Sequence, residues 1–99
     1  MSGIWPENLV KYGETPLFTE ESVPSKLTSV HSTKPGVWGK LVVEKGVLNY
    51  IVSGSPETVQ CVKAGQFGVI EPEVVHRVEL LGAVAFRVEF YRHDEDTSS

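Results

Sequence analysis

The chain has little cysteine, no excess of basic charge and no long apolar run. Its single cysteine, Cys61, rules out an internal disulfide, so the fold does not depend on an oxidising compartment. With 9 Lys and Arg against 13 Asp and Glu, the net charge of −4 argues against a nucleic-acid-binding surface. No apolar segment approaches the roughly 20 residues of a membrane-spanning helix, and no signal-peptide pattern opens the chain. We therefore expect a cytoplasmic protein whose partners include neither nucleic acid nor membrane.

Motifs of several enzyme classes are missing as well. No serine stands in the Gly-x-Ser-x-Gly turn that carries the nucleophile of many hydrolases. Phosphate-cradling glycine loops and the ligand spacings of zinc fingers are also absent. No catalytic residue can be assigned, and whether the chain is an enzyme stays open.

The sequence does contain a series of short apolar segments separated by turn residues. Prolines and glycines interrupt residues 1–24, which we expect to form an irregular arm packed on the rest of the chain. About seven short strands with closely spaced turns predict a β-sandwich or a small barrel, because no segment has helical periodicity. The expected strands are residues 26–31, 37–43, 47–52, 58–63, 67–70, 74–81 and 84–91.

One histidine stands among the valines of such a segment. His76 shares a strand face with Val74 and Val78, because side chains alternate with period two along a strand. An imidazole in an apolar interior must be hydrogen-bonded, metal-bound or part of a pocket. His76 is therefore the leading candidate for a site residue, and a buried histidine bonded to the backbone is the alternative.

The spacing around His76 follows a known frame, Gly-x5-Pro-x-Gly-x2-His. Gly65, Glu71-Pro72-Glu73 and His76 occupy it, with Glu71 and Glu73 at the positions of the usual proline and second glycine. This spacing resembles the second cupin motif. Gly46 matches the last glycine of the first cupin motif, of whose histidine pair only His31 remains.

A second pattern extends over nearly the whole chain, from about residue 5 to residue 91. The segments that carry it are residues 31–43, Gly46, residues 48–50, residues 64–67, Pro72-Glu73, His76 and residues 86–90. In these segments the sequence is similar to the TehB/YeaR-like domain family, small cupin-type domains that occur alone or ahead of a methyltransferase in some tellurite-resistance proteins. Methyl transfer is not carried over, because 99 residues leave no room for a second catalytic domain.

The resemblance implies an all-β, single-domain fold. We expect residues 25–92 to form a cupin-type double-stranded β-helix, a jelly-roll barrel. Residues 93–99 should form a disordered acidic and polar tail in which His93 is exposed. A cupin site at the barrel mouth would bind a divalent ion, Zn, Ni, Fe or Mn, through His31 and His76.

Glu89 is the candidate for a third metal ligand. It alternates with Val88 and Phe90, which predicts that it lies with Arg87 on the face away from the core. Charge pairing across neighbouring strands is one interpretation, with Arg77 expected on the adjacent strand. Metal ligation by Glu89 is the other, and it requires a bulge to turn this face inward.

Other charged residues allow a site or a solvated surface. Lys34 and Lys40 flank Trp38 and could hold an anionic ligand, or could cover a strand surface. Glu71 and Glu73 could tune His76, or could belong to a solvated turn.

We therefore expect a small cupin-like domain that binds a divalent metal or a small ligand, including an anion, and that is linked to tellurite or other oxyanion stress. A cupin-type metalloenzyme, such as an oxygenase or isomerase, and a structural self-association module are the alternatives. A homodimer is expected by analogy with small cupin-type domains.

Overall fold

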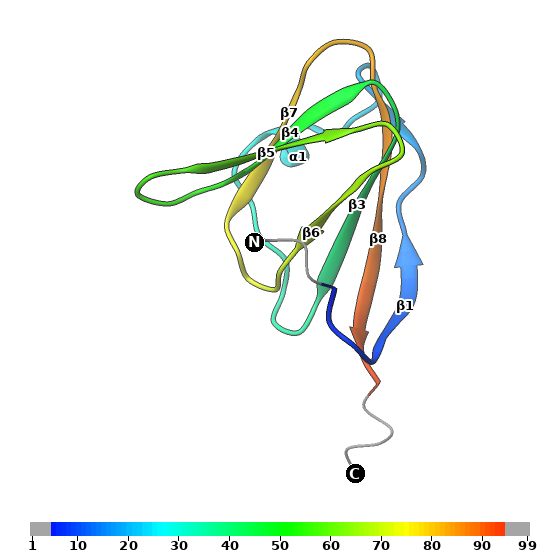
Figure 1. Cartoon of the computed structure of the whole chain (residues 1–99), viewed down its shortest axis with the longest axis vertical. Helices are drawn as coiled ribbons and strands as arrows, with labels where there is room; N and C mark the ends of the chain where they lie inside the picture. The colour runs from blue at the N-terminus through cyan, green and yellow to red at the C-terminus, as the bar shows by residue number, and fades with distance from the viewer. Residues whose placement is uncertain (1–4, 95–99) are drawn as a thin grey trace.

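In the computed structural model, which describes residues 5–94, the chain forms two antiparallel β-sheets that pack face to face (Figure 1). The all-β, single-domain prediction is confirmed. The elements are β1 (Leu9–Glu14), β2 (Phe18–Thr19), α1 (Ser25–Thr28), β3 (Trp38–Lys45), β4 (Val47–Val52), β5 (Thr58–Lys63), β6 (Phe67–Ile70), β7 (His76–Leu80) and β8 (Ala85–His93).

The strand order places the two longest strands in the middle of the larger sheet. That sheet has the order β1-β8-β3-β6, with β2 also paired to β8, and the smaller sheet has the order β5-β4-β7. In Figure 1, β3 and β8 follow the long axis of the molecule while β4 and β5 cross its upper part. Within residues 5–94 no strand belongs to both sheets, so the sheets do not close into a barrel, and the expected jelly-roll barrel is not confirmed. The physical reason is that consecutive strands at the sheet boundaries, such as β7 and β8, pair with different partners.

The core lies between the sheets and follows the alternation of the strands. Gly39, Leu41 and Val43 of β3 point inward, whereas Trp38 and Lys40 lie on the outer face. Burying such side chains is the main source of stability in a fold of this kind. The buried core cluster consists of Leu41, Val43, Leu48, Tyr50, Val62, Ile70, Val78, Val84, Phe86 and Val88.

The N-terminal segment differs from the irregular arm that we expect. Residues 9–14 form β1, an edge strand whose register with β8 runs from Leu9 opposite His93 to Glu14 opposite Glu89. The prolines of this region flank the strand and do not interrupt it. β1 is an edge strand and pairs on one side only, so most of its side chains are partly exposed. Its sequence therefore lacks the regular alternation of apolar residues by which a buried strand is recognised.

The prediction of a strand over residues 26–31 is wrong. This segment begins with the single turn α1, which the backbone hydrogen bond from Ser29 N to Ser25 O closes at 3.1 Å. The hydroxyl of Ser29 also donates to Ser25 O at 3.0 Å. Serine side chains stabilise turns by such local hydrogen bonds. Only His31, beyond the turn, pairs with a strand.

The strands β7 and β8 are consecutive in sequence but are not neighbours in a sheet. β7 pairs with β4, and β8 pairs with β1, β2 and β3. The prediction that Arg77 lies on a strand adjacent to Glu89 is therefore wrong. Arg77 contacts Glu57 instead, at 3.9 Å.

The strand β8 ends at His93, one residue before Asp94, the last described residue. His93 is exposed, as predicted, but it belongs to β8 and not to the expected tail, of which residues 95–99 lie outside the described residues. In residues 5–94 we find no helix with the length and apolar character that crossing a membrane requires.

Candidate functional site

The structure brings His31 and His76 together as a pair joined through their backbones. His31 N donates to His76 O at 2.9 Å, and His76 N donates to His31 O at 2.8 Å. The two ring centroids are 4.3 Å apart with an interplanar angle of 64°. His76 begins β7 and is only 2% exposed, whereas His31 follows α1 and is half-buried. We call these two residues the histidine pair.

In each histidine, Nδ1 is hydrogen-bonded and Nε2 remains free to accept a hydrogen bond or to bind a ligand. His31 Nδ1 lies 2.9 Å from Ser29 O, and His76 Nδ1 lies 2.7 Å from Val74 O. A carbonyl oxygen can only accept, so each Nδ1 carries the hydrogen and each Nε2 presents a lone pair when the ring is neutral. Neither Nε2 has a hydrogen-bond partner in the described part of the chain. A backbone carbonyl on Nδ1 is also the common way to orient a metal-binding histidine.

Both imidazoles line a cavity of about 410 Å³ between the two sheets. No fully buried polar side-chain atom within residues 5–94 lacks a partner, so the unpartnered Nε2 of His76 is not fully buried. The inner wall is apolar and comprises Leu41, Ile70, Val78, Phe86, Val88 and Phe90. The rim comes from β1, α1 and the segment before β3, with Tyr12, Thr15, Lys26, Leu27, Ser32, Thr33, Lys34 and Val37.

Burial keeps the inner groups of this region neutral. Desolvation lowers the pKa of His76 below 6.5, and His31 adds to the effect while the Val74 carbonyl opposes it. Burial, aided by the charge of Glu71, raises the pKa of Tyr50 to about 12. The rings of Tyr50 and His76 are 5.3 Å apart. His76 therefore offers a neutral imidazole at neutral pH.

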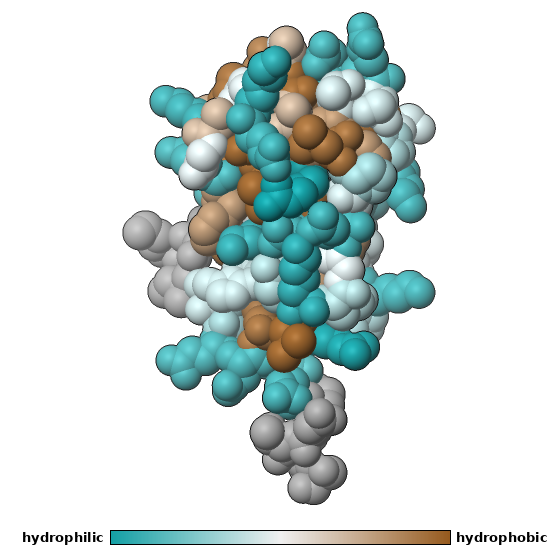
Figure 2. All heavy atoms as spheres, turned by 90° about the vertical axis from the view of Figure 1, so that its right-hand side faces the viewer, coloured by the Kyte–Doolittle hydropathy of each residue, from teal (hydrophilic) through white to brown (hydrophobic). Residues whose placement is uncertain are grey.

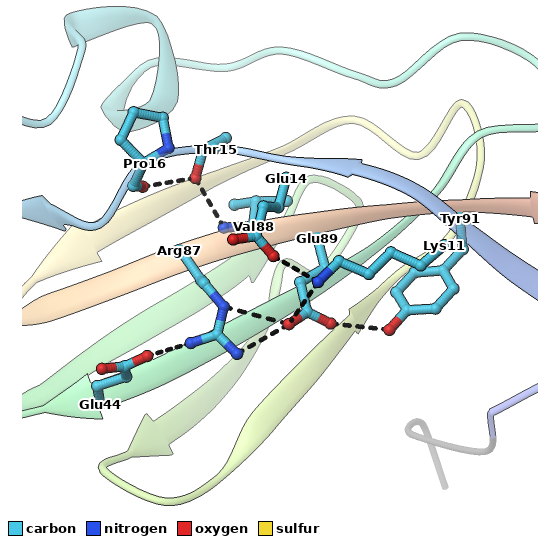
Figure 3. A network of polar contacts seen from close by, with 9 residues as sticks. All are labelled: Lys11, Glu14, Thr15, Pro16, Glu44, Arg87, Val88, Glu89 and Tyr91. Atoms are coloured by element: carbon cyan, nitrogen blue, oxygen red, sulfur yellow. Dashed lines mark hydrogen bonds and ion pairs between the residues drawn. The ribbon is translucent and has the colours of Figure 1, made fainter.

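The third predicted ligand, Glu89, lies elsewhere. It is on the outer face of the larger sheet, where it accepts hydrogen bonds from Tyr91 Oη at 2.8 Å and from Arg87 Nη2 at 2.8 Å (Figure 3). Lys11 Nζ is 3.6 Å from the same carboxylate, and Arg87 also pairs with Glu44. Glu89 does not line the cavity, and the residues that the structure describes contain no cluster of three or more His, Cys, Asp or Glu suited to a metal.

The lysines expected beside Trp38 are separated. Lys34 lines the cavity, whereas Lys40 Nζ lies over the rings of Trp5 and Phe67 at 5.4 and 4.4 Å from their centroids. Trp38 is on the same outer face, with its ring centroid 6.5 Å from that of Trp5. Lys40 therefore covers an aromatic surface away from the histidine pair.

The two glutamates near His76 belong to its surroundings and not to the cavity lining. Glu71 lines a separate recess of about 240 Å³ with Tyr50. The backbone N–H of Glu73 donates to Thr33 Oγ1 at 3.2 Å, which connects this turn to the rim of the cavity.

Sequence reasoning missed Lys26 and Thr33 as rim residues. Both belong to the segment assigned as a strand and a turn, and neither stands in a motif. The apolar wall was recognisable in part, because Phe86, Val88 and Phe90 alternate on β8. No local signal indicates that the segment after α1 closes over that wall.

Acid is expected to weaken the fold through Glu89. Burial raises the pKa of this carboxyl, but hydrogen bonds from Tyr91 and Arg87 and the charge of Lys11 outweigh burial and hold the pKa below 4.5. As pH falls, the unfolded chain therefore takes up the proton first. The stabilisation is complete above about pH 5 and is lost as pH falls through 4.5 toward the lower folded-state pKa.

Glu89→Gln tests this expectation. Its free energy of unfolding should be about 2 kcal/mol below wild type at pH 7, and the difference should shrink between about pH 5 and about pH 3. Urea unfolding across this range measures both values. Glu57→Gln, which removes a carboxylate that is 51% exposed, is the matched control. A difference that stays constant with pH would contradict the assignment.

Comparison with known proteins identifies relatives over most of the chain. The model of the TehB-like domain matches residues 13–88. The uncharacterized protein YeaR of Escherichia coli (strain K12) is 30% identical over 95 residues, which cover 87% of this chain and 80% of YeaR. A crystal structure of a protein from Escherichia coli (strain K12) superposes with a TM-score of 0.86 at 30% identity, covering 96% of this chain and 100% of that one.

A longer relative carries a similar segment. The probable S-adenosyl-L-methionine-dependent methyltransferase TehB of Haemophilus influenzae is 31% identical over 93 residues, which cover 89% of this chain but 32% of TehB. The resemblance predicted from the sequence is confirmed by the family model and by these relatives. The chain belongs to the TehB-like domain family.

Proposed function

We propose that this chain is a small-ligand-binding domain whose site is the cavity between the two sheets. The observation that carries the proposal is the histidine pair, whose rings line a cavity of about 410 Å³ with an apolar inner wall and whose Nε2 atoms have no hydrogen-bond partner in the described residues. Small-molecule sites are commonly apolar cavities of this size with a few converging polar groups. The cupin-type jelly roll belongs to the same proposal, supported by the two facing sheets and by the spacing from Gly65 to His76.

The arrangement suits recognition better than it suits acid–base catalysis. The Nδ1–H of each ring is engaged by a carbonyl, which holds its orientation. The pKa of His76 is lowered mainly by burial, so at neutral pH this ring accepts a hydrogen bond or binds a cation through Nε2. The described lining of the cavity contains no carboxylate that could act as a partner acid or base.

A divalent metal is the second candidate, and the two Nε2 atoms are the observation that favours it. The donor set fits Zn, Ni, Fe or Mn in part, because the carbonyls on Nδ1 orient both rings as they do in metal sites. His31 and His76 would supply two nitrogen ligands, and other ligands would have to come from solvent or from a bound molecule. A bound ion would act as a Lewis acid toward such a molecule.

Histidine NMR signals provide the test, because the chain contains its own control. It has three histidines, and His93 lies at the end of β8 outside the cavity lining. A fragment library, and separately zinc or nickel, should shift the imidazole signals of His31 and His76 while leaving that of His93 in place. His76→Ala and His31→Ala should each weaken binding by about tenfold or more.

Each outcome of this experiment has a definite consequence. Calorimetric titration into wild type and the double alanine variant gives the affinities. Equal metal uptake by both would remove the metal candidate. If neither fragments nor metals move the two cavity signals, the proposed site is wrong.

The other expectations remain predictions. A metalloenzyme and a link to tellurite or other oxyanion stress rest on the family resemblance, and a cytoplasmic location rests on the sequence pattern alone. The homodimer gains support from the free edge of β1, where Val10 and Tyr12 are about half exposed. Figure 2, which views the right-hand side of Figure 1, shows apolar patches within a largely hydrophilic surface. Light scattering that reports only the monomer mass up to millimolar concentration would exclude self-association.

A further inference from the structure

We propose that the ligand of the cavity is an organic anion, a monocarboxylic acid with an apolar body. Its carboxylate would lie at the rim between Lys26, Lys34 and the histidine pair, and its apolar body would cover Leu27, Val37 and Phe90 of the cavity lining. This inference rests on the proposed function and specifies the class of ligand.

The first argument is the sign of the charge around the cavity. Acidic residues outnumber basic ones in the chain, 13 against 9, yet the described cavity lining contains no aspartate or glutamate. Its charged residues are two lysines, Lys26 and Lys34, beside the histidine pair. Charges of one sign around a low-dielectric hollow attract a ligand of the opposite sign. A carboxylate is therefore favoured here over a metal cation.

The second argument is that the two lysines are not already paired. Within residues 5–94 the ion pairs of basic residues involve Lys11, Arg77 and Arg87 but neither Lys26 nor Lys34. The acidic turn that is hydrogen-bonded to Thr33 carries Glu71, which lines the separate recess with Tyr50. The ammonium groups at the rim are thus available to a ligand.

The third argument separates an organic acid from an inorganic oxyanion. Among the apolar residues around the cavity, Leu27, Val37 and Phe90 are only partly buried, so they leave apolar surface that a ligand can cover. A small inorganic anion could contact the lysines but would bury none of this apolar surface. An acid with an aliphatic or aromatic body would bury it, and the gain grows with the apolar area removed from water.

The test compares acids with neutral molecules of the same shape. The probes are straight-chain carboxylates of four to ten carbons and phenylacetate, each beside its primary amide, in buffer containing EDTA. We expect carboxylates to shift the His31 and His76 signals, with affinity rising along the series and about tenfold above that of the matching amide. Inorganic phosphate should bind more weakly than the longer acids.

Charge-matched variants complete the design. Lys26→Gln with Lys34→Gln should reduce the preference for acid over amide to about threefold or less. Lys45→Gln with Lys63→Gln changes the net charge equally at lysines outside the cavity lining and should leave the preference unchanged. Circular dichroism checks that both double variants are folded.

The outcomes separate this inference from the proposed function. If amides bind as well as acids, the ligand is not an anion and this inference is wrong. The proposed function, a small-ligand site in the cavity, would still hold. A preference that survives loss of Lys26 and Lys34 would also overturn the inference. If neither acids nor amides shift the His31 and His76 signals up to the solubility limit, the inference is wrong. The proposed function is wrong only if the fragment library and the metals also fail to shift these two signals.

Discussion

Leu48→Ala is expected to lower the free energy of unfolding by about 3–5 kcal/mol. Leu48 lies in β4, the central strand of the smaller sheet, and is 0% exposed within the core. Its truncation removes buried apolar atoms and leaves a hollow that neighbours on both sheets cannot fully close. A domain of this size is stabilised by only about 5–15 kcal/mol, so much of the margin would be lost.

Leu81→Ala is the matched control, because the chemical change is the same at a side chain that is 48% exposed. Leu81→Ala should change the free energy of unfolding by no more than about 0.5 kcal/mol. Urea unfolding followed by circular dichroism measures both variants. Similar costs for the two would show that the core is not where the structure places it.

Gly46→Ala should destabilise the protein by about 3 kcal/mol or more, because two penalties add. Gly46 joins β3 to β4 with φ +75, a backbone region that L-residues avoid. An added Cβ would also lie 2.1 Å from the backbone oxygen of Ala83, so the turn before β8 would have to move. The turn connects the two sheets, and its displacement would disturb both.

Gly36→Ala separates the two penalties. Gly36 has φ +78, but an added Cβ would meet nothing within 4 Å. Its cost should be about 1–2 kcal/mol, from the backbone conformation alone. Thermal or urea unfolding of both variants tests the difference, and equal losses would rule out the close approach of Gly46 to Ala83.

The outer face of β8 was predictable from the sequence. Alternation places Arg87 and Glu89 away from Val88, and the structure finds them there in contact with each other. A bulge would have been needed to turn Glu89 inward. The β1–β8 pairing does contain a register shift, but it lies on β1 between Lys11 and Gly13. It therefore leaves the alternation of side chains along β8 intact.

The segment around the histidine pair was only partly predictable. His76 was identified by its valine neighbours and is buried as expected. His31 was assigned to a strand that does not form, because α1 and the hydroxyl of Ser29 make local hydrogen bonds instead. Its contact with His76 comes from a single pair of backbone hydrogen bonds between distant segments.

The sequence by itself determined the class of fold, the family and the extent of the strands at residues 47–52 and 58–63, because alternation and turn residues are local signals. The hairpin expected between residues 37–43 and 47–52 does not form, because β3 and β4 belong to different sheets. Only the tertiary structure decided that β1 joins the larger sheet and that β7 and β8 separate into different sheets. It also decided that His31 and His76 share a cavity with Lys26 and Lys34, without Glu89. The physical reason is that pairing partners, and the closure of a segment over a cavity, depend on contacts between residues far apart in the chain. Local pattern carries no information about those contacts.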